Sequence, residues 1–251
     1  STAGWNRKPW DRLPSRSQAA GTSSSAVSTA AAVRRKKNCS INVCMRMVKE
    51  GTADAAVSAG NSGAMAASAL FILGRIKGVA RPAIATVLPT ADADRPLLLL
   101  DAGANTDCDH EWLREFAVMG DVYSRLVLGR ETPEVGLMSI GTEDCKGNEL
   151  TKQAFPILRN YTPSITFKGN VEGHDVFEGK TDVIVCDGFI GNVILKTAES
   201  ACHAMGGWLK RIIKSRLMYK IAAILLIPAL KKFKQQMDPE VYGGAPLLGV
   251  P

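Results

Sequence analysis

Short, almost wholly apolar runs recur along the chain from residue 41 onward. They lie at 53–58, 83–88, 97–101, 135–140 and 182–186, with a weaker run at 164–167. Strands that are covered on both faces lose the usual alternation of apolar and polar residues, so runs of this length and composition predict buried strands.

Stretches with a helical period separate these runs. They lie at 41–50, 62–73, 109–128, 149–158 and 191–236, and the last is expected to be interrupted. Gly51 and Gly74 follow the first two as candidate C-caps. Strands that alternate with helices predict an α/β fold, with a mainly parallel sheet and helices on both faces. Ligands of such sheets bind at the carboxyl ends of the strands.

Residues 1–33 show neither the strand period of 2 nor the helical period of about 3.6 residues, and they consist largely of Ser, Ala, Arg and Pro. Such a segment lacks the apolar residues needed to build a core. We therefore expect residues 1–33 to be a disordered or non-homologous extension and residues 34–251 to form the functional domain.

Composition excludes several classes of protein. Hydrophobic residues make up 46% of the 251 residues, which is enough for one sizeable core. The longest apolar run, 221–230, contains Pro228 and is far shorter than the ~20 residues that a membrane-spanning helix needs. Six cysteines without a CxxC pair indicate free thiols in a reducing, cytoplasmic compartment.

The net charge of +7 is unevenly distributed. Residues 1–37 carry eight Lys/Arg and one acid, and residues 206–237 carry eight Lys/Arg and no acid, so the body between them is acidic. Basicity confined to two ends does not favour a nucleic-acid-binding protein.

Gly- and Asn-rich turns follow several of the predicted strands. Glycines let the backbone approach a ligand, and the amides of a following helix start attract anions. Turns of this kind lie at 58–63, 101–105, 141–149, 169–174 and 186–192. Five turns at one sheet edge predict one cleft for an anionic ligand.

Each turn also has a simpler interpretation. The glycines of 58–63 suit an ordinary turn, Asp101 suits a helix cap, and Lys146 suits a solvated loop. Cys145 and Cys186 are either acyl-accepting nucleophiles or, as we prefer, small apolar residues. The spacing of the three histidines predicts no metal site, and GxGxxG is absent.

The basic segment 206–237 mixes its lysines and arginines with large apolar residues. It predicts an amphipathic helical hairpin, bent at Pro228, that lies on an anionic membrane surface. A dimer contact with solvated charged flanks is the alternative.

Nine segments, read together, resemble one known family. They are RRKKNCS (34–40), VSAGNSGA (57–64), ALFILGRIKGVARPAIATVLPT (69–90), LDAGAN (100–105), FAVMG (116–120), KGNEL (146–150), GNVEG (169–173), VCDGFIGNVILKT (185–197) and YGGAPLLGV (242–250). Together they are similar to the PlsX-type phosphate acyltransferases of bacteria, over residues 34–250 almost without a gap.

This resemblance implies a fold like that of isocitrate dehydrogenase and phosphotransacetylase, with a projecting C-terminal helical hairpin. It implies a homodimer, cytoplasmic and peripherally membrane-associated, that makes acyl phosphate from long-chain acyl carrier protein and inorganic phosphate. No cofactor or metal is implied, and a downstream glycerol-phosphate acyltransferase would use the product in phospholipid synthesis. Phosphate itself is the nucleophile of this reaction, so the site needs to position anions and stabilise an oxyanion.

The expected residue roles follow from this chemistry. Phosphate and substrate binding is expected at Gly60, Asn61, Ser62, Gly63, Asp101, Asn105 and Lys196. Catalytic positions are expected at Lys146, Asn148, Asn170, Asp187 and Asn192. Carrier-protein docking is expected at Arg75, Lys77 and Arg81, and membrane contact at Lys220, Ile224, Leu225, Leu226 and Lys231.

The sequence departs from the family pattern at both ends. The family opens with a strand and an Asp-x-Met-Gly-Gly-Asp turn, and it continues beyond the segment 242–250 with a strand and a helix. We therefore expect the domain 34–251 to be incomplete at both ends. Two other functions stay open: a phosphotransacetylase that uses acyl coenzyme A, and a non-catalytic, membrane-bound partner of downstream acyltransferases.

Overall fold

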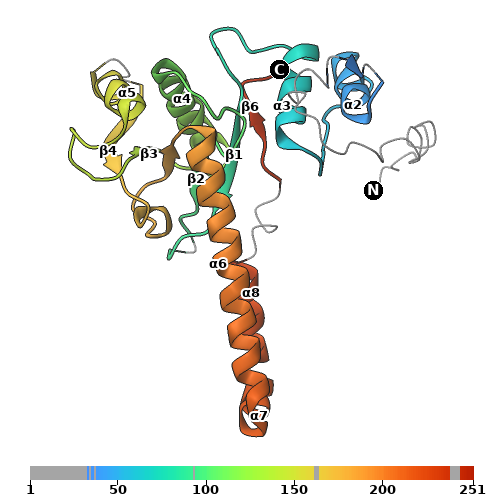
Figure 1. Ribbon diagram of the computed structural model, residues 1–251, viewed down its shortest axis with the longest axis vertical. Helices are drawn as coiled ribbons and strands as arrows, with labels where there is room; N and C mark the ends of the chain where they lie inside the picture. Colours follow the sequence, from blue (N-terminus) through green and yellow to red (C-terminus); the bar gives the residue numbers. More distant parts are fainter. Residues whose placement is uncertain (1–32, 34, 37, 93, 161–163, 238–243) are drawn as a thin grey trace.

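The computed structural model describes residues 33, 35, 36, 38–92, 94–160, 164–237 and 244–251 (Figure 1). A six-stranded sheet in the order β4-β3-β5-β2-β1-β6 forms its centre. The strands are β1 (Ala83–Leu88), β2 (Leu97–Leu100), β3 (Glu134–Met138), β4 (Thr166–Val171), β5 (Val183–Val185) and β6 (Leu247–Leu248). The helices are α2 (Ser40–Lys49), α3 (Ser62–Ile72), α4 (His110–Leu126), α5 (Glu149–Asn160), the 3₁₀ turn η3 (Asp175–Phe177), α6 (Gly188–Ser215), α7 (Leu217–Leu225) and α8 (Ile227–Met237).

Four neighbouring strands, β4, β3, β5 and β2, are parallel, whereas β1 and β6 are antiparallel additions at one side. The predicted α/β fold with a mainly parallel sheet is therefore confirmed. Because β2 to β5 run the same way, the loops that follow them meet at one edge of the sheet.

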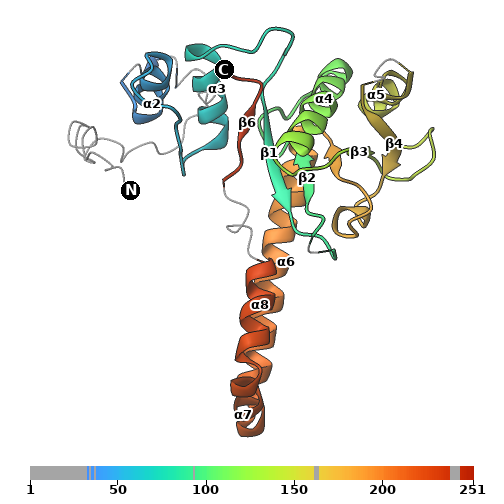
Figure 2. The same cartoon turned by 180° about the vertical axis from the view of Figure 1, so that it is seen from behind.

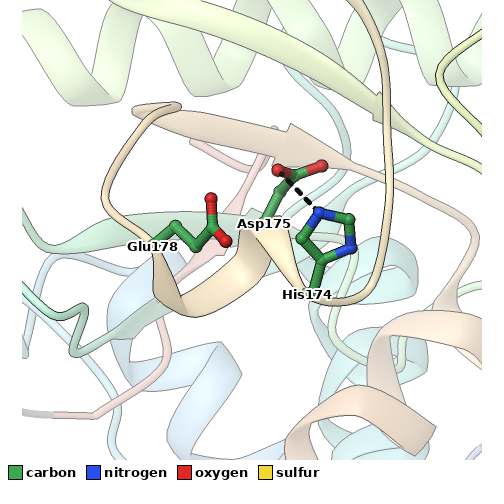
Figure 3. Close-up of side chains that lie close together, drawn as sticks. All are labelled: His174, Asp175 and Glu178. Atoms are coloured by element: carbon green, nitrogen blue, oxygen red, sulfur yellow. Dashed lines mark ion pairs between the residues drawn. The ribbon is translucent and has the colours of Figure 1, made fainter.

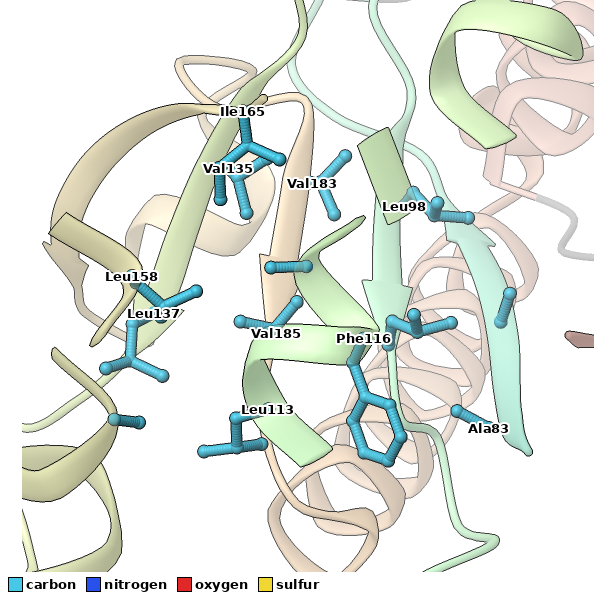
Figure 4. Packing of buried hydrophobic residues seen from close by; sticks show 14 of the residues in the cluster. Ala83, Leu98, Leu113, Phe116, Val135, Leu137, Leu158, Ile165, Val183 and Val185 are labelled. Carbon is cyan, nitrogen blue, oxygen red and sulfur yellow. The ribbon is translucent and has the colours of Figure 1, made fainter. Parts of the chain in front are cut away.

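The two faces of the sheet are covered by different helices. Leu98, Val183 and Leu137 belong to the cluster that packs against α4 and α5 (Figure 4). Leu99 and Ile184 belong to a second cluster, which Ile190 and Ile194 of α6 cover. Adjacent residues of one strand point to opposite faces, so the continuous apolar runs seen in the sequence serve two cores.

The predicted strand at 53–58 is wrong. This segment belongs to no strand, and the side chain of Val57 is 95% exposed. A short apolar run becomes a strand only when another backbone supplies its hydrogen bonds. Among the described residues, no strand lies beside 53–58 to do so.

The weakly predicted strand at 164–167 differs in its limits. β4 begins two residues later than the weak run at 164–167 and extends to Val171, so Gly169 and Asn170 lie inside a strand rather than in a turn. Gly169 has a φ of +114° beside a register shift in the β3–β4 pairing, which is the backbone of a bulge. The predicted extension 1–33 lies outside the described residues except for Val33.

The last predicted helical stretch is interrupted, as expected, and forms three helices. The breaks lie at Arg216 and Leu226, whereas Pro228, the predicted bend, is the second residue of α8. In α6 only Gly188 and Gly191 are buried, and α7 buries no residue. Both views show α6 projecting far from the sheet, with α8 returning beside it and α7 at the tip (Figures 1 and 2). Across the described ranges, no helix is long and apolar enough to cross a membrane.

Candidate functional site

Loops from four neighbouring strands meet at the carboxyl edge of the parallel sheet. They are 101–105 after β2, 139–148 after β3, 172–174 after β4 and 186–187 after β5. Two of these loops lead directly into helices, α5 and α6, whose N-termini carry a partial positive charge. The edge thus gathers four of the five predicted turns.

Asp101 organises the loop after β2. Its carboxylate is fully buried and accepts hydrogen bonds from the backbone N–H groups of Ile84, Gly103, Ala104 and Asn105, at 2.7–3.1 Å. The Asn105 amide group donates to the same carboxylate, at 2.9 Å, and to the carbonyl of Pro82, at 2.8 Å. Both side chains therefore fix the conformation of the loop. A ligand would contact the loop backbone that they hold and not the Asp101 and Asn105 side chains themselves.

Two glycines let α6 begin directly against this loop. A Cβ at Gly188 would lie 2.7 Å from the carbonyl oxygen of Asn105, and a Cβ at Gly191 would overlap that of Asp101. Gly188 N–H donates to Asn105 O at 2.6 Å. The Oδ1 atom of Asn192 lies 3.7 Å from the position that a Cβ would take at Gly103. The close approach brings the exposed Asn192 next to the Asp101 loop.

Asp187 and Asn148 cap the two helices of the edge. The Asp187 carboxylate accepts from the N–H of Ile190 at 2.8 Å, and the Asn148 side chain accepts from the N–H of Thr151 at 2.9 Å. Both groups are predicted site residues, and both also serve as ordinary N-caps. Lys196, two turns into α6, forms an ion pair with Glu199 at 2.8 Å.

The loop 139–148 is tied to the neighbouring strand by Asn170. The buried Asn170 amide group donates to the carbonyl of Glu143 at 2.8 Å. Its Oδ1 and the hydroxyl of Ser139 are buried without a hydrogen-bond partner. Lys146 is exposed on the same loop. Sequence reasoning missed Ser139, because a single serine after a strand carries no pattern.

The fifth predicted turn, 58–63, lies apart from this edge. Asn61 caps α3 by accepting from the N–H of Ala64 at 2.9 Å. Gly60 and Ser62 line a mostly apolar groove between α2, α3 and β6. Throughout the described part of the chain, no hydrogen bond joins the turn 58–63 to the four loops. The structure thus divides the predicted phosphate-binding and catalytic residues between two places.

Burial keeps two of the thiols protonated. Burial raises the pKa of Cys108 to about 12, and it raises the pKa of the fully buried Cys186 well above its usual value. A protonated thiol is a poor nucleophile. Cys186 is a small buried side chain, as preferred, while Cys145 is exposed on the loop that carries Lys146.

One group of side chains offers three possible metal ligands within 4.8 Å of one another, namely His174, Asp175 and Glu178 (Figure 3). His174 and Glu178 are exposed, and Lys180 forms an ion pair with Glu178. A lysine at that carboxylate competes with a cation, so the group gives little support for a metal centre.

The edge of the sheet can therefore bind an anion and polarise a carbonyl group, and its buried Cys186 is held as the protonated thiol. Helix N-termini, amide side chains and one lysine are suited to positioning an anion and to stabilising an oxyanion. These features define a class of protein, an α/β protein whose sheet edge is suited to binding an anionic ligand.

Comparison with known proteins narrows this class to a family. The family model described as "Fatty acid synthesis protein" matches residues 15–251, and the chain belongs to that family. The chain is 54% identical over 219 residues to the phosphate acyltransferase of Desulforamulus reducens, and 52% identical over 223 residues to that of Nostoc sp.. Each match covers 87% of this chain and 64% of the relative, so the chain spans less than two thirds of their length.

Among solved structures, a phosphotransacetylase from Streptococcus pyogenes shares the fold. The TM-score is 0.52 at 16% sequence identity, over 64% of this chain and 54% of that one. The fold that the sequence predicted is confirmed by this likeness.

Proposed function

We propose that this chain is an acyltransferase that makes acyl phosphate from long-chain acyl carrier protein and inorganic phosphate. The observation that carries this proposal is that relatives 54% and 52% identical are named phosphate acyltransferase. The sheet edge adds support, because its helix N-termini and amide groups suit anions and its buried Cys186 is held as the protonated thiol.

In the proposed reaction, an oxygen of hydrogen phosphate attacks the thioester carbonyl carbon. The carbon–sulfur bond then breaks, and the proton of hydrogen phosphate ends on the leaving thiolate to give free carrier protein. The negative charge that develops on the carbonyl oxygen needs a fixed donor. Lys146 would supply it, with Asn148, Asn170, Asp187 and Asn192 lining the acyl thioester.

Phosphate would bind at Asn61, Ser62 and Gly63, beside Gly60, and the two substrates would meet between this turn and the loop of Asp101 and Asn105. Ile84 lies between them, since it lines the groove of Gly60 and Ser62 and its N–H donates to Asp101. Lys196 would add positive charge on α6.

Lys146 provides the first test. Lys146→Ala removes the proposed oxyanion donor and should lower kcat of phosphate-dependent acyl transfer about 100-fold. Lys152→Ala removes another exposed lysine six residues away and should leave kcat unchanged. The assay measures free thiol released from long-chain acyl carrier protein. An unchanged rate in Lys146→Ala would make the assignment wrong.

A second candidate is a phosphotransacetylase that acts on acyl coenzyme A, which the shared fold with the Streptococcus pyogenes protein favours. The same assay run with acyl coenzyme A separates the two substrates. Turnover with neither substrate would favour a non-catalytic partner of downstream acyltransferases.

We also propose that the chain acts in the cytoplasm as a homodimer held at an anionic membrane surface. Lys220, Ile224, Leu225, Leu226 and Lys231, all exposed at or near the tip of the projecting hairpin, would contact the lipid. Acyl phosphate made there would pass to a glycerol-phosphate acyltransferase. Docking of the carrier protein would use Arg75, Lys77 and Arg81.

A further inference from the structure

The loop between α3 and β1 presents an isoleucine to solvent between two cations. Ile76 is 48% exposed and is flanked by the exposed Arg75 and Lys77, with Arg81 five residues further on. About half of the Ile76 side chain is thus open to another molecule. An apolar centre with a polar or charged rim is the usual anatomy of a protein-docking surface.

The backbone around Ile76 is fixed on both sides. Ile76 N–H donates to the carbonyl of Gly249 at 3.0 Å, and the Ile76 carbonyl accepts from Val79 N–H at 3.1 Å. Gly78, with a φ of +90°, stands at the third position of this turn, as a type II turn requires, so Lys77 lies at its tip. A loop that is already ordered loses little conformational freedom when it binds a partner.

Two of the three cations of the loop are also held in place. The Arg75 guanidinium donates to the carbonyl of Ala80, and the Arg81 guanidinium lies 4.9 Å from the centre of the Trp112 ring on α4. The nearby carboxylate of Glu115 accepts from Ala80 N–H at 2.6 Å. With three cations against the one carboxylate of Glu115, the surface around Ile76 carries a net positive charge, and a negatively charged partner would complement it.

This surface adjoins the candidate site. Pro82, directly after Arg81, accepts from the Asn105 side chain, and the carbonyl of Asn105 accepts from Gly188 at the start of α6. The hairpin tip at α7 lies at the opposite end of the molecule (Figures 1 and 2). A partner bound at Ile76 would sit beside the sheet edge and away from a bilayer that contacts the tip.

We propose that Ile76 is the apolar anchor of a docking surface for an acidic protein helix, with Arg75, Lys77 and Arg81 as its charged rim. This rests on the proposed function and assigns the partner as the acidic acyl carrier protein, whose thioester arm then reaches the loops 101–105 and 139–148. Apolar anchors supply most of the affinity of such contacts, while rim charges steer association and respond to salt.

The test compares two substrates and two variants of the full chain. Ile76→Ser should raise KM for acyl carrier protein about 5- to 10-fold, as expected for the loss of a half-buried isoleucine contact. It should leave KM unchanged for the same acyl group on free pantetheine, which has no protein to dock. Leu126→Ser, an exposed apolar residue at the far end of α4, should change neither KM.

A second readout does not depend on turnover. Calorimetric titration of the chain with carrier protein that bears no acyl group should show the same 5- to 10-fold weakening in Ile76→Ser, and Ile76→Leu should restore affinity. Lys77→Glu should also weaken binding, and by less at high salt than at low salt.

Three outcomes would overturn the proposal. One is an equal rise in KM for both substrates, another is unchanged carrier binding in Ile76→Ser, and the third is a change from dimer to monomer in that variant, which would assign Ile76 to a contact between copies. If the wild-type chain transfers neither acyl group but still binds the carrier through Ile76, the proposed function fails while the docking surface stands.

Discussion

At the scale of single residues, burial decides what the polar groups of this protein can do. Aspartate is a common ligand-binding residue, but the carboxylate of Asp101 already accepts hydrogen bonds from four backbone N–H groups and from the Asn105 side chain. Asn170 is directed inward in the same way, toward the carbonyl of Glu143. The side chains left to meet a substrate directly are the exposed Lys146, Asn148, Asn192 and Lys196 and the half-buried Asp187, together with the amides of the loops. Asn170 would act through the loop 139–148 that it holds.

The thiols give a prediction at this scale. The pKa of Cys108 is about 12 in the folded chain, above the ordinary value of 9.0, mainly because burial disfavours the thiolate. The unfolded chain therefore releases this proton first, and the free energy of unfolding should fall as the pH rises above 9, by up to about 1.4 kcal/mol per pH unit. The free energy of unfolding, measured with urea in steps of about half a pH unit from pH 8 up to the highest pH at which the chain still folds, checks this prediction.

Cys108→Ala should reduce the slope of that fall without abolishing it, because the pKa of the buried Cys186 is also raised, and Cys145→Ala, at an exposed thiol, is the control. A fall of equal steepness in Cys108→Ala and wild type would show that other groups control the alkaline stability.

At the scale of elements, α6 joins the candidate site to the hairpin. Its first turn lies against the Asp101 loop, and its remainder leaves the sheet and projects into solvent. Two glycines of this helix therefore lie in opposite surroundings, one closely packed and one open. Gly191 is required by close packing, whereas Gly206, further along, faces open space, with no neighbouring segment within 4 Å of where a Cβ would lie.

A matched pair of substitutions tests this contrast. Gly191→Ala should destabilise the fold by about 2 kcal/mol or more, because its methyl group would overlap the carbonyl oxygen of Asp101. Gly206→Ala should stabilise α6 by about 0.5–1 kcal/mol, because alanine loses less backbone entropy in a helix. Thermal melts followed by circular dichroism would reveal the two signs. Equal effects would mean that the start of α6 is free to move away from the loop.

At the scale of the whole molecule, the protein consists of a compact α/β body and a long apolar projection. Ile224, Leu225 and Leu226 are 54–80% exposed at its tip, close to the basic Lys220 and Lys231. Apolar surface of this kind is rarely left in water. We expect either a lipid surface or a second copy of the chain to bury these side chains, and experiments can distinguish the two.

For the lipid surface, the double variant Leu225→Glu, Leu226→Glu should reduce flotation with anionic vesicles at least about tenfold, because membrane affinity follows the apolar area buried. The fold should be unaffected, since α7 buries no residue. Leu126→Glu, at a residue as exposed as Leu225, is the control. Unchanged flotation together with a loss of the dimer would assign the tip to the contact between copies.

Local sequence pattern is enough to predict the order and type of nearly all the elements, the interrupted hairpin and the family. Apolar period, glycine caps and turn residues act within a few positions of the chain. Three features depend instead on the folded chain: 53–58 is not a strand, the turn 58–63 lies apart from the other loops, and Asp101 and Asn170 face inward. Strand pairing and burial depend on which distant segment lies alongside, and no local pattern carries that information.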